Sequence, residues 1–334
     1  MIKLIGLPES NEVMDAKLKN YPLVLAPSSL GICNLTCIYC YMADIMNKES
    51  ILKYADHVSV LDQMKTLGCK YVIYAMEGEP FLDQFFHDRH KDTFPLVEDA
   101  NRRGMYVVVF TNMTMFTEEK LKTLHKMNIS IIGKLNAMDS NIHNSLMNRE
   151  EKWESYDGIF LPKGIKLLLE AGFNKCEKGM TRLGVDIVIT RKNLHHIEGV
   201  IEFCDKYNIK PIIDTLIPSG NARKNLDVLE LDENDNRWLY KLLRDRWGDE
   251  FVNDQFIEGC AIGEVGLAYD SSGNVKACCT LGADIGNIKQ ESIKVLFENV
   301  QKYRSTLPKY EKSKDIINMC ARAKLLTYHH DVTE

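Results

Sequence analysis

Short apolar runs alternate with segments of helical periodicity along most of this chain. Each run is largely apolar along its whole length, as expected of strands that are buried on both faces of a sheet. Strands and helices that alternate in this way form a parallel sheet with helical crossovers, so the pattern predicts an α/β fold. A doubly wound sheet and a partial or full barrel both fit it. The predicted strands are residues 23–28, 71–76, 105–112, 130–137, 183–190 and 210–218.

Amphipathic segments between these strands predict the helices. The segment 161–171 ends in "LLLEA", and Gly172, directly after it, is expected to cap the helix. In both α/β architectures ligands bind at the carboxyl ends of the strands, so polar residues there are the first candidates for a functional site. The predicted helices are residues 51–67, 95–103, 117–127, 161–171 and 194–207.

The alternation stops near residue 225. A charged, Asp-rich helical stretch follows at 231–246, and then a cysteine-containing region with tight turns. We expect no separate leader-peptide-binding domain in the roughly twenty residues before the first strand. We therefore predict three parts, namely an N-terminal extension (1–20), an α/β core (21–225) and a small C-terminal domain (226–334).

Composition limits the classes of function. Of the 334 residues, 45% are hydrophobic and 27% are charged, which is enough apolar material for a large buried core. The net charge of −5 argues against bulk nucleic-acid binding. The N-terminus has no long apolar segment with a cleavage site, and no run approaches the roughly 18 apolar residues that span a membrane. We expect no membrane segment and a cytoplasmic location.

Three cysteines, Cys33, Cys37 and Cys40, follow the first predicted strand in the sequence "CNLTCIYC". Disulfides are rare in a reducing compartment, so this spacing favours metal binding. Thiolates are the usual ligands of iron–sulfur clusters, which normally take four. Three thiolates on one loop would leave one iron of a four-iron cluster open to a small molecule, much as a catalytic zinc keeps an open position. Buried or reactive thiols, or a zinc knuckle without its fourth ligand, are the alternatives.

A second group of four cysteines lies near the C-terminus. A Ser-Ser-Gly-Asn turn between two short β-like segments would bring Cys260 and Cys278 together. This arrangement predicts a second metal site, and a cysteine-rich hairpin core or a zinc site is the alternative. The four cysteines are Cys260, Cys278, Cys279 and Cys320.

The loop "CNLTCIYCY" resembles the cluster-binding loop of the radical SAM superfamily. The sequence "EGEP" (77–80), at the end of the second predicted strand, is similar to the acidic Gly-Glu motif of that family. The resemblance extends to about residue 225. It implies a partial (β/α)6, TIM-like barrel with a 4Fe-4S cluster on the three cysteines and S-adenosylmethionine (SAM) on the open iron. It also implies one-electron cleavage of SAM to a 5′-deoxyadenosyl radical, which abstracts hydrogen from a substrate, with flavodoxin or ferredoxin as electron donor.

The same resemblance assigns SAM contacts to successive strand ends. Tyr39 would contact the adenine, and Gly78 and Glu79 would meet the methionine amino group. Polar residues on the next two strands would hold the ribose and carboxylate, namely Thr111, Asn112, Lys134 and Asn136. A lysine within an apolar strand costs stability unless it is paired, which favours a functional role for Lys134.

Three further charged residues could face either SAM or the substrate, with a structural ion pair as the alternative for each. They are Arg182, Asp186 and Asp214. The two aspartates are the candidates for catalytic residues.

The C-terminal cysteines resemble the opening of the SPASM or twitch extension, which binds an auxiliary iron–sulfur cluster in radical SAM enzymes. A full SPASM domain carries more cysteines than this chain has. The resemblance therefore implies a single auxiliary 4Fe-4S cluster held by Cys260, Cys278 and Cys320. Cys279 or an open iron site would complete the ligand set.

Three functions are compatible with these features. The first is a radical SAM oxidoreductase acting on a small molecule, such as a dehydrogenase, in which the auxiliary cluster accepts an electron or orients the substrate. The second is a peptide- or protein-modifying maturase that performs cross-linking, oxidation or epimerisation. The third is a non-catalytic iron–sulfur or zinc-binding protein.

Overall fold

Six parallel strands follow one another in chain order and extend inward from one edge of the main sheet. The computed structural model describes residues 2–28, 31–44, 46, 51–256, 260–277, 279 and 283–306. Each of the six strands overlaps one of the predicted strands, which confirms the strand assignment. They are β2 (Val24–Pro27), β3 (Tyr71–Tyr74), β4 (Tyr106–Thr111), β5 (Ile129–Lys134), β9 (Leu183–Ile189) and β10 (Lys210–Thr215).

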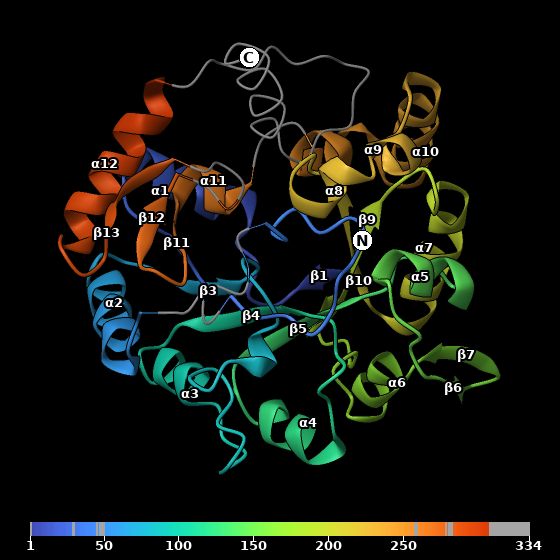
Figure 1. Ribbon diagram of the computed structural model, residues 1–334, viewed down its shortest axis with the longest axis horizontal. Coiled ribbons are helices and arrows are strands. Elements are labelled where there is room, and N and C mark those ends of the chain that lie inside the picture. Colours follow the sequence, from blue (N-terminus) through green and yellow to red (C-terminus); the bar gives the residue numbers. More distant parts are fainter. Residues whose placement is uncertain are drawn as a thin grey trace.

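The helices that connect these strands lie around the outside of the sheet (Figure 1). All five predicted helices are present. Gly172 follows the C-terminus of α6 with a φ of +79°, the left-handed conformation that commonly ends a helix. The five are α2 (Tyr54–Thr66), α3 (Pro95–Arg102), α4 (Glu118–His125), α6 (Lys163–Glu170) and α7 (Ile197–Tyr207).

The sheet is apolar on both faces. Val107 and Val109 of β4 pack outward in the main hydrophobic core with the surrounding helices. Val108, between them, points inward and packs with Ile73 and Ile132, as the alternation of side chains along a strand requires. Because the crossover helices cover only the outer face, the α/β fold is a partial barrel rather than a doubly wound sheet.

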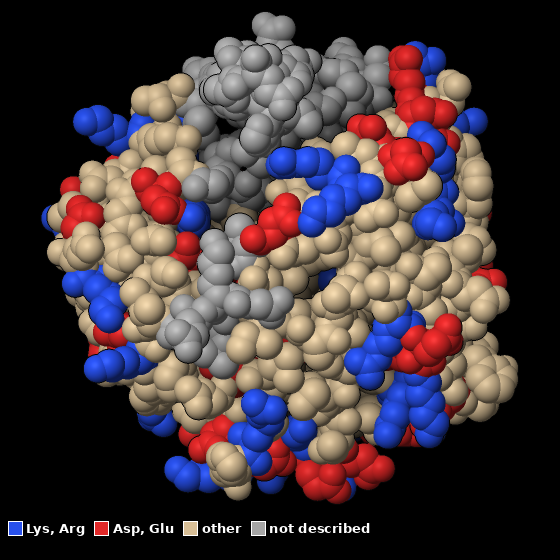
Figure 2. Space-filling view, viewed as in Figure 1, with Lys and Arg blue, Asp and Glu red and all other residues tan. Residues whose placement is uncertain are grey.

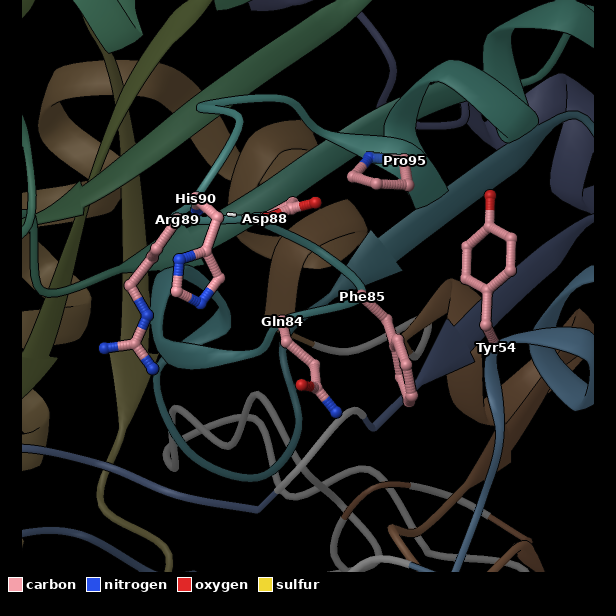
Figure 3. A pocket seen from close by; sticks show the side chains of 7 residues that line it. All are labelled: Tyr54, Gln84, Phe85, Asp88, Arg89, His90 and Pro95. Atoms are coloured by element: carbon pink, nitrogen blue, oxygen red, sulfur yellow. Dashed lines mark hydrogen bonds between the residues drawn. The ribbon is translucent and has the colours of Figure 1, made fainter.

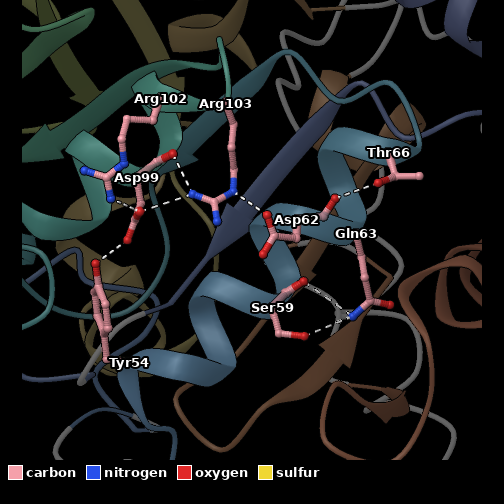
Figure 4. A network of polar contacts seen from close by, with 8 residues as sticks. All are labelled: Tyr54, Ser59, Asp62, Gln63, Thr66, Asp99, Arg102 and Arg103. Carbon is pink, nitrogen blue, oxygen red and sulfur yellow. Dashed lines mark hydrogen bonds and ion pairs between the residues drawn. The ribbon is translucent and has the colours of Figure 1, made fainter.

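A polar network joins α2 to α3 on the outside of the barrel (Figure 4). Arg103 Nε donates to Asp62 Oδ1 at 2.8 Å, and Arg103 Nη1 donates to Asp99 Oδ1 at 3.1 Å. The hydroxyl of Tyr54 also donates to Asp99. With Asp99 almost fully buried, this network is a structural contact between neighbouring helices.

The connection between β5 and α6 contains elements that the sequence reading left unassigned. It holds α5 (Ser140–Met147) and a hairpin of β6 (Trp153–Tyr156) and β7 (Ile159–Pro162). The strands of the hairpin are only four residues long, and they mix the buried Leu161 with Phe160, which is 67% exposed, so the local sequence pattern is weak. Two short 3-10 helices are also present. The first, η1 (Pro80–Leu82), follows β3, and the second, η2 (Leu194–His196), directly precedes α7.

The N-terminal extension folds against the inner side of the barrel. Its strand β1 (Lys3–Leu4) pairs with β8 (Met180–Thr181), and α1 (Ser10–Lys19) follows. Leu4 packs with the inward-facing strand residues. An ion pair of 2.9 Å joins Lys17 Nζ to Glu264, so the extension also contacts the C-terminal part.

The C-terminal part continues the sheet of the barrel. Strand β11 (Gly266–Tyr269) pairs in parallel with β2, and β12 (Asn274–Lys276) and β13 (Asp284–Asn287) add antiparallel strands. The result is one nine-stranded sheet. The helices after β10 are α8 (Gly220–Lys224), α9 (Leu226–Leu229), α10 (Glu233–Phe256), α11 (Ala261–Val265) and α12 (Ile293–Thr306).

The charge of the surface and the apolar character of the helices are relevant to binding of nucleic acids and membranes. Over the face shown in Figure 2, basic and acidic side chains are interspersed in small groups, and its described residues present no broad basic area. None of the described helices has both the length and the apolar character needed to cross a membrane.

Candidate active site

A cavity of about 730 Å³ lies at the carboxyl ends of the barrel strands and reaches the C-terminal part. Its walls come from the cysteine loop, the strand ends, α1 and the segments that flank the C-terminal hairpin. Most of the predicted site residues line it, namely Cys33, Cys37, Tyr39, Cys40, Gly78, Glu79, Thr111, Asn112, Lys134, Asp186, Asp214, Cys260 and Cys279.

The Gly-Glu motif supports the cysteine loop through its backbone. Gly78 has a φ of +78°, and a Cβ there would lie 2.4 Å from the carbonyl oxygen of Ile32. The backbone N–H of Glu79 donates to that same oxygen at 2.7 Å. Only glycine permits this approach and this backbone conformation, so the motif positions the residue next to Cys33.

Helix α8 supports the other end of the loop. The backbone N–H of Asn221 donates to the carbonyl oxygen of Cys40 at 2.9 Å, and its side-chain amide donates to that of Cys37 at 3.2 Å. Sequence reasoning assigned no role to Asn221. The signal was its place in the segment that follows the last barrel strand, since functional residues often lie in such connections.

The three thiols have the character of cluster ligands. Burial, together with the nearby Cys40 and Cys33, raises the pKa of Cys37 to about 12, and burial also raises the pKa of Cys33 and Cys40. Three partly buried thiolates on one loop need a compensating cation, which iron supplies. Among the described residues no three side chains converge as ligands of a single metal ion. A four-iron cluster requires no such convergence, because each thiolate binds a different iron.

Glu79 lies in the cavity wall and is held by its own neighbours. Thr111 Oγ1 donates to Glu79 Oε1 at 2.6 Å, and the backbone N–H of Asn112 donates to Oε2 at 2.7 Å. Burial raises the pKa of the Glu79 carboxyl to about 7, against the opposing effect of these hydrogen bonds. Thr111 and Asn112 therefore position the carboxylate. The side-chain amide of Asn112 also donates to Asn34 in the cysteine loop at 2.9 Å.

Tyr39 and Asn136 form a pair beneath the cysteine loop. The amide of Asn136 donates to the Tyr39 hydroxyl at 3.1 Å, and that hydroxyl donates to the sulfur of Met147 at 3.0 Å. Asn136 Oδ1 accepts from the backbone N–H of Val188 at 3.2 Å. Asn136 is fully buried and does not line the cavity in the described part of the chain. Its contacts therefore support Tyr39 from outside the cavity.

Lys134, Asp186 and Asp214 form a charged group inside the cavity, which we call the ionic trio. Lys134 pairs with Asp186 and lies 5.8 Å from the centre of the Tyr39 ring. Arg182, by contrast, lies at the amino end of β9 and donates to backbone carbonyls, including that of Ile129 at 2.9 Å. Arg182 therefore has the structural role that was the alternative, although its donors are used by backbone carbonyls and not by an ion pair.

The C-terminal cysteines approach the same cavity. Cys260 directly precedes α11, and Cys279 lies just after β12. The predicted hairpin is present, with β11 and β12 joined by a turn in which Gly273 has a φ of +81°. Cys278 and Cys320 lie outside the described residues.

Arg304 of α12 holds the two cysteine-bearing segments together. Its guanidinium donates to the carbonyl oxygens of Ile262 and Gly266, at 2.8 and 3.0 Å, and to that of Ala277. Ile262 lies two residues after Cys260, and Ala277 two residues before Cys279. Sequence reasoning missed this buried arginine, because nothing local distinguishes it from a surface arginine near a helix C-terminus.

Glu77 links the barrel to the C-terminal hairpin. Its Oε2 accepts from Ser28 Oγ of the cysteine-loop strand end at 2.8 Å and from the backbone N–H of Ser271 at 3.2 Å. The first glutamate of "EGEP" therefore has a positioning role that the motif alone did not reveal.

A second cavity, of about 710 Å³, lies between α2 and the loop that leads to α3 (Figure 3). None of the predicted site residues lines it. Its lining consists of Tyr54, Gln84, Phe85, Asp88, Arg89, His90 and Pro95.

Comparison with known proteins decides the family. The model of the radical SAM superfamily matches residues 28–204, which is more than half of the chain. The chain belongs to the radical SAM superfamily. The matched stretch contains the three-cysteine loop and "EGEP", as the sequence resemblance implied. A 4Fe-4S cluster and SAM are the cofactors of this family, and the residues around the cavity fit both.

The relatives of this radical SAM protein include members of SPASM- and twitch-containing families. Fe-coproporphyrin III synthase of Methanosarcina barkeri is 24% identical over 204 residues, which are 60% of this chain and 46% of the synthase. The chain therefore spans less than half the length of that relative. The cysteine-type anaerobic sulfatase-maturating enzyme of Clostridium novyi is 23% identical over 279 residues, covering 79% of this chain and 69% of that enzyme.

Solved structures share the fold. Streptococcus suis SuiB bound to its precursor peptide SuiA has a TM-score of 0.66 and 18% identity, and the match covers 94% of this chain and 75% of SuiB. SuiB has also been solved bound to S-adenosylmethionine. At this identity the likeness establishes the partial-barrel fold.

Proposed function

We propose that this radical SAM enzyme reductively cleaves SAM and acts as an oxidoreductase on a small molecule bound in the cavity. When bound, the 4Fe-4S cluster supplies the electron that cleaves SAM to a 5′-deoxyadenosyl radical, which abstracts hydrogen from the substrate. A flavodoxin or ferredoxin would reduce the cluster.

The observation that carries this proposal is the shared cavity. Cys33, Cys37 and Cys40 line it together with Cys260 and Cys279. A substrate between the two groups of cysteines would be close to SAM on one side and to an auxiliary cluster on the other. This position suits an auxiliary 4Fe-4S cluster that accepts an electron from the substrate or orients it.

Individual side chains have separate tasks in this proposal. The three loop cysteines hold the SAM-binding cluster, and Cys260, Cys278 and Cys320 supply the auxiliary ligands, with Cys279 or an open iron site as the fourth. Glu79 binds the methionine amine, since a buried carboxylate favours a cationic partner. Tyr39 contacts the adenine, and the nearby polar strand ends contact the ribose and carboxylate. The larger apolar wall excludes water from the reacting atoms.

Modification of a peptide or protein is the second candidate. It is favoured by the likeness to SuiB, whose structure holds a precursor peptide, and to a sulfatase-maturating enzyme. Cross-linking, oxidation and epimerisation all begin with the same hydrogen abstraction, so the cavity residues keep their tasks.

Release of 5′-deoxyadenosine tests the proposal. Anaerobically reconstituted protein is incubated with SAM and dithionite, and the products are separated by chromatography. We expect SAM-dependent release in the wild type and none in Cys37→Ala. Absence of 5′-deoxyadenosine from protein with intact clusters would contradict the proposal. Addition of candidate small molecules or peptides, with mass spectrometry of each, distinguishes the two substrate classes.

A further inference from the structure

The ionic trio lies inside the barrel, between an apolar floor and the cysteine loop. Lys134 follows the floor residue Ile132 by two positions on β5, and Asp214 follows Ile212 by two positions on β10. Side chains two apart on a strand point to the same side. Asp186 belongs to the same layer, because it is the register partner of both Lys134 and Ile212.

The trio contains more acceptors than donors. Asp186 Oδ2 pairs with Lys134, but the buried Asp186 Oδ1 and Asp214 Oδ1 have no hydrogen-bond partner among the described residues. Asp186 is only 1% exposed. A buried carboxylate oxygen without a donor costs free energy, so this arrangement is complete only when a ligand donates to it.

The charge balance indicates what kind of donor fits. The trio holds one ammonium group and two carboxyl groups, and without a ligand a proton can neutralise the second carboxylate. Burial and the neighbouring charge of Asp186 raise the pKa of Asp214 to about 8, although Lys134 opposes this shift. The charged and titratable groups that face the trio from other elements are Cys37, Tyr39 and Cys40 of the cysteine loop. A cationic ligand would take the place of the proton on Asp214 and balance its negative charge. A neutral hydroxyl group would leave that second buried carboxylate unbalanced.

The rest of the cavity is mainly apolar. Met14 of α1, Phe110 of β4 and Ile212 of β10 contribute to its walls. A volume of about 730 Å³ lies in the upper part of the range of roughly 300–1,000 Å³ for ligand pockets. In this inference SAM and a small second molecule share that volume.

We propose that Asp214, with Asp186, binds a cationic amine of the substrate, so that the enzyme acts on molecules that join an ammonium group to an apolar body. This inference rests on the proposed function, since it takes SAM to occupy the part of the cavity next to the three-cysteine loop. Asp214 is then a residue that determines substrate specificity.

Binding of three probes with the same apolar tail tests the inference. Hexylamine, hexanol and hexanoate are titrated by calorimetry into the anaerobically reconstituted protein, with SAM at saturation. We expect hexylamine to bind at least about tenfold more tightly than hexanol, and hexanoate to bind most weakly. In Asp214→Asn the affinity for hexylamine should fall about 30-fold, while that for hexanol changes less than about twofold.

Asp157→Asn is the matched control. Asp157 lies in the exposed turn of the β6–β7 hairpin, and its φ of +49° is one that asparagine also adopts. This variant makes the same change of charge and should alter no probe affinity. If Asp214→Asn failed to fold, the contrast between the three probes in the wild type would decide the question.

Four results separate the outcomes. Equal wild-type affinities for hexylamine and hexanol, or an equal loss of both in Asp214→Asn, would overturn the inference. Weaker SAM binding in that variant with unchanged amine selectivity would also overturn it, because the carboxylate would then serve SAM. Amine selectivity without any SAM cleavage would support the amine site and contradict the proposed function alone.

Discussion

The two sides of the cavity are built by different means. On the barrel side, Lys134, Asp186 and Asp214 lie on neighbouring parallel strands, and the backbone register places them together. On the C-terminal side, Cys260 and Cys279 flank short elements whose backbone is held by the side chain of Arg304. The barrel side is therefore determined by the sheet as a whole, whereas the C-terminal side depends on a few individual contacts.

Removal of the barrel-side cysteines should have the largest effect. The triple replacement of Cys33, Cys37 and Cys40 by alanine should abolish SAM cleavage and lower the iron content from about eight to about four per chain, since each 4Fe-4S cluster holds four irons. Iron analysis and 5′-deoxyadenosine release measure both effects. Cys204→Ala, at a buried cysteine outside the cavity, is the control and should change neither. Full cleavage by the triple variant would contradict the assignment.

Removal of the C-terminal cysteines should separate the two sides. Replacement of Cys260, Cys278 and Cys320 by alanine should halve the iron content and leave part of the SAM cleavage, while turnover of the substrate collapses. Iron analysis, Mössbauer spectroscopy and product assays measure these effects. Zinc in place of a second cluster would rule out a role in electron transfer.

Cys279→Ala tests the fourth ligand of the auxiliary cluster. Loss of that cluster would identify Cys279 as a ligand, and a retained cluster would indicate an open iron. Iron analysis with Mössbauer spectroscopy distinguishes the two results.

A smaller effect is expected at Glu79, which lies on the barrel side but binds no metal in this account. Glu79→Gln should weaken SAM binding about 10- to 100-fold and leave both clusters in place, because it removes a charged partner of the methionine amine. The raised pKa of about 7 means that the carboxylate is lost as the pH falls below 7. Wild-type SAM affinity should therefore decrease on acidification, and the glutamine variant should lack this dependence. Equal SAM affinity in the two proteins would contradict the assigned contact.

The smallest effect concerns Arg304. Arg304→Gln leaves several buried carbonyl oxygens without their donor, and we expect the free energy of unfolding to fall by about 2–4 kcal/mol. Thermal unfolding measures this loss. Iron analysis should show that the auxiliary cluster is partly lost while the SAM-binding cluster is retained. Arg237→Gln, at an exposed arginine of α10, is the control. Equal retention of both clusters in Arg304→Gln would contradict the positioning role.

The same difference between the two sides of the cavity explains which of its features could be predicted from the sequence. Strands buried on both faces have a local signal, and polar residues at their ends are then placed by the rules of parallel sheets. The family resemblance assigned Glu79 and Lys134 to such strand ends, and both line the cavity, as does Asp214. The same resemblance selected Asn136, yet its amide is used by Tyr39 and Val188.

Contacts between segments that are distant in the chain have no local pattern in the sequence from which they could be predicted. The pairing of β11 with β2 joins strands of four residues from opposite ends of the chain. The contacts of Arg304 with Ile262 and Ala277 depend on how α12 packs, as does the contact of α1 with the C-terminal part. Such features follow from tertiary packing, which overrides short-range sequence patterns.

Electron paramagnetic resonance of the reduced clusters, with and without SAM, tests the central claim most directly. The account predicts that SAM alters the spectrum of the cluster retained when Cys260, Cys278 and Cys320 are replaced, because SAM binds the open iron held by the three-cysteine loop. It predicts no change in the cluster retained when Cys33, Cys37 and Cys40 are replaced. A SAM-induced change in that C-terminal cluster, or none in the N-terminal one, would contradict the account.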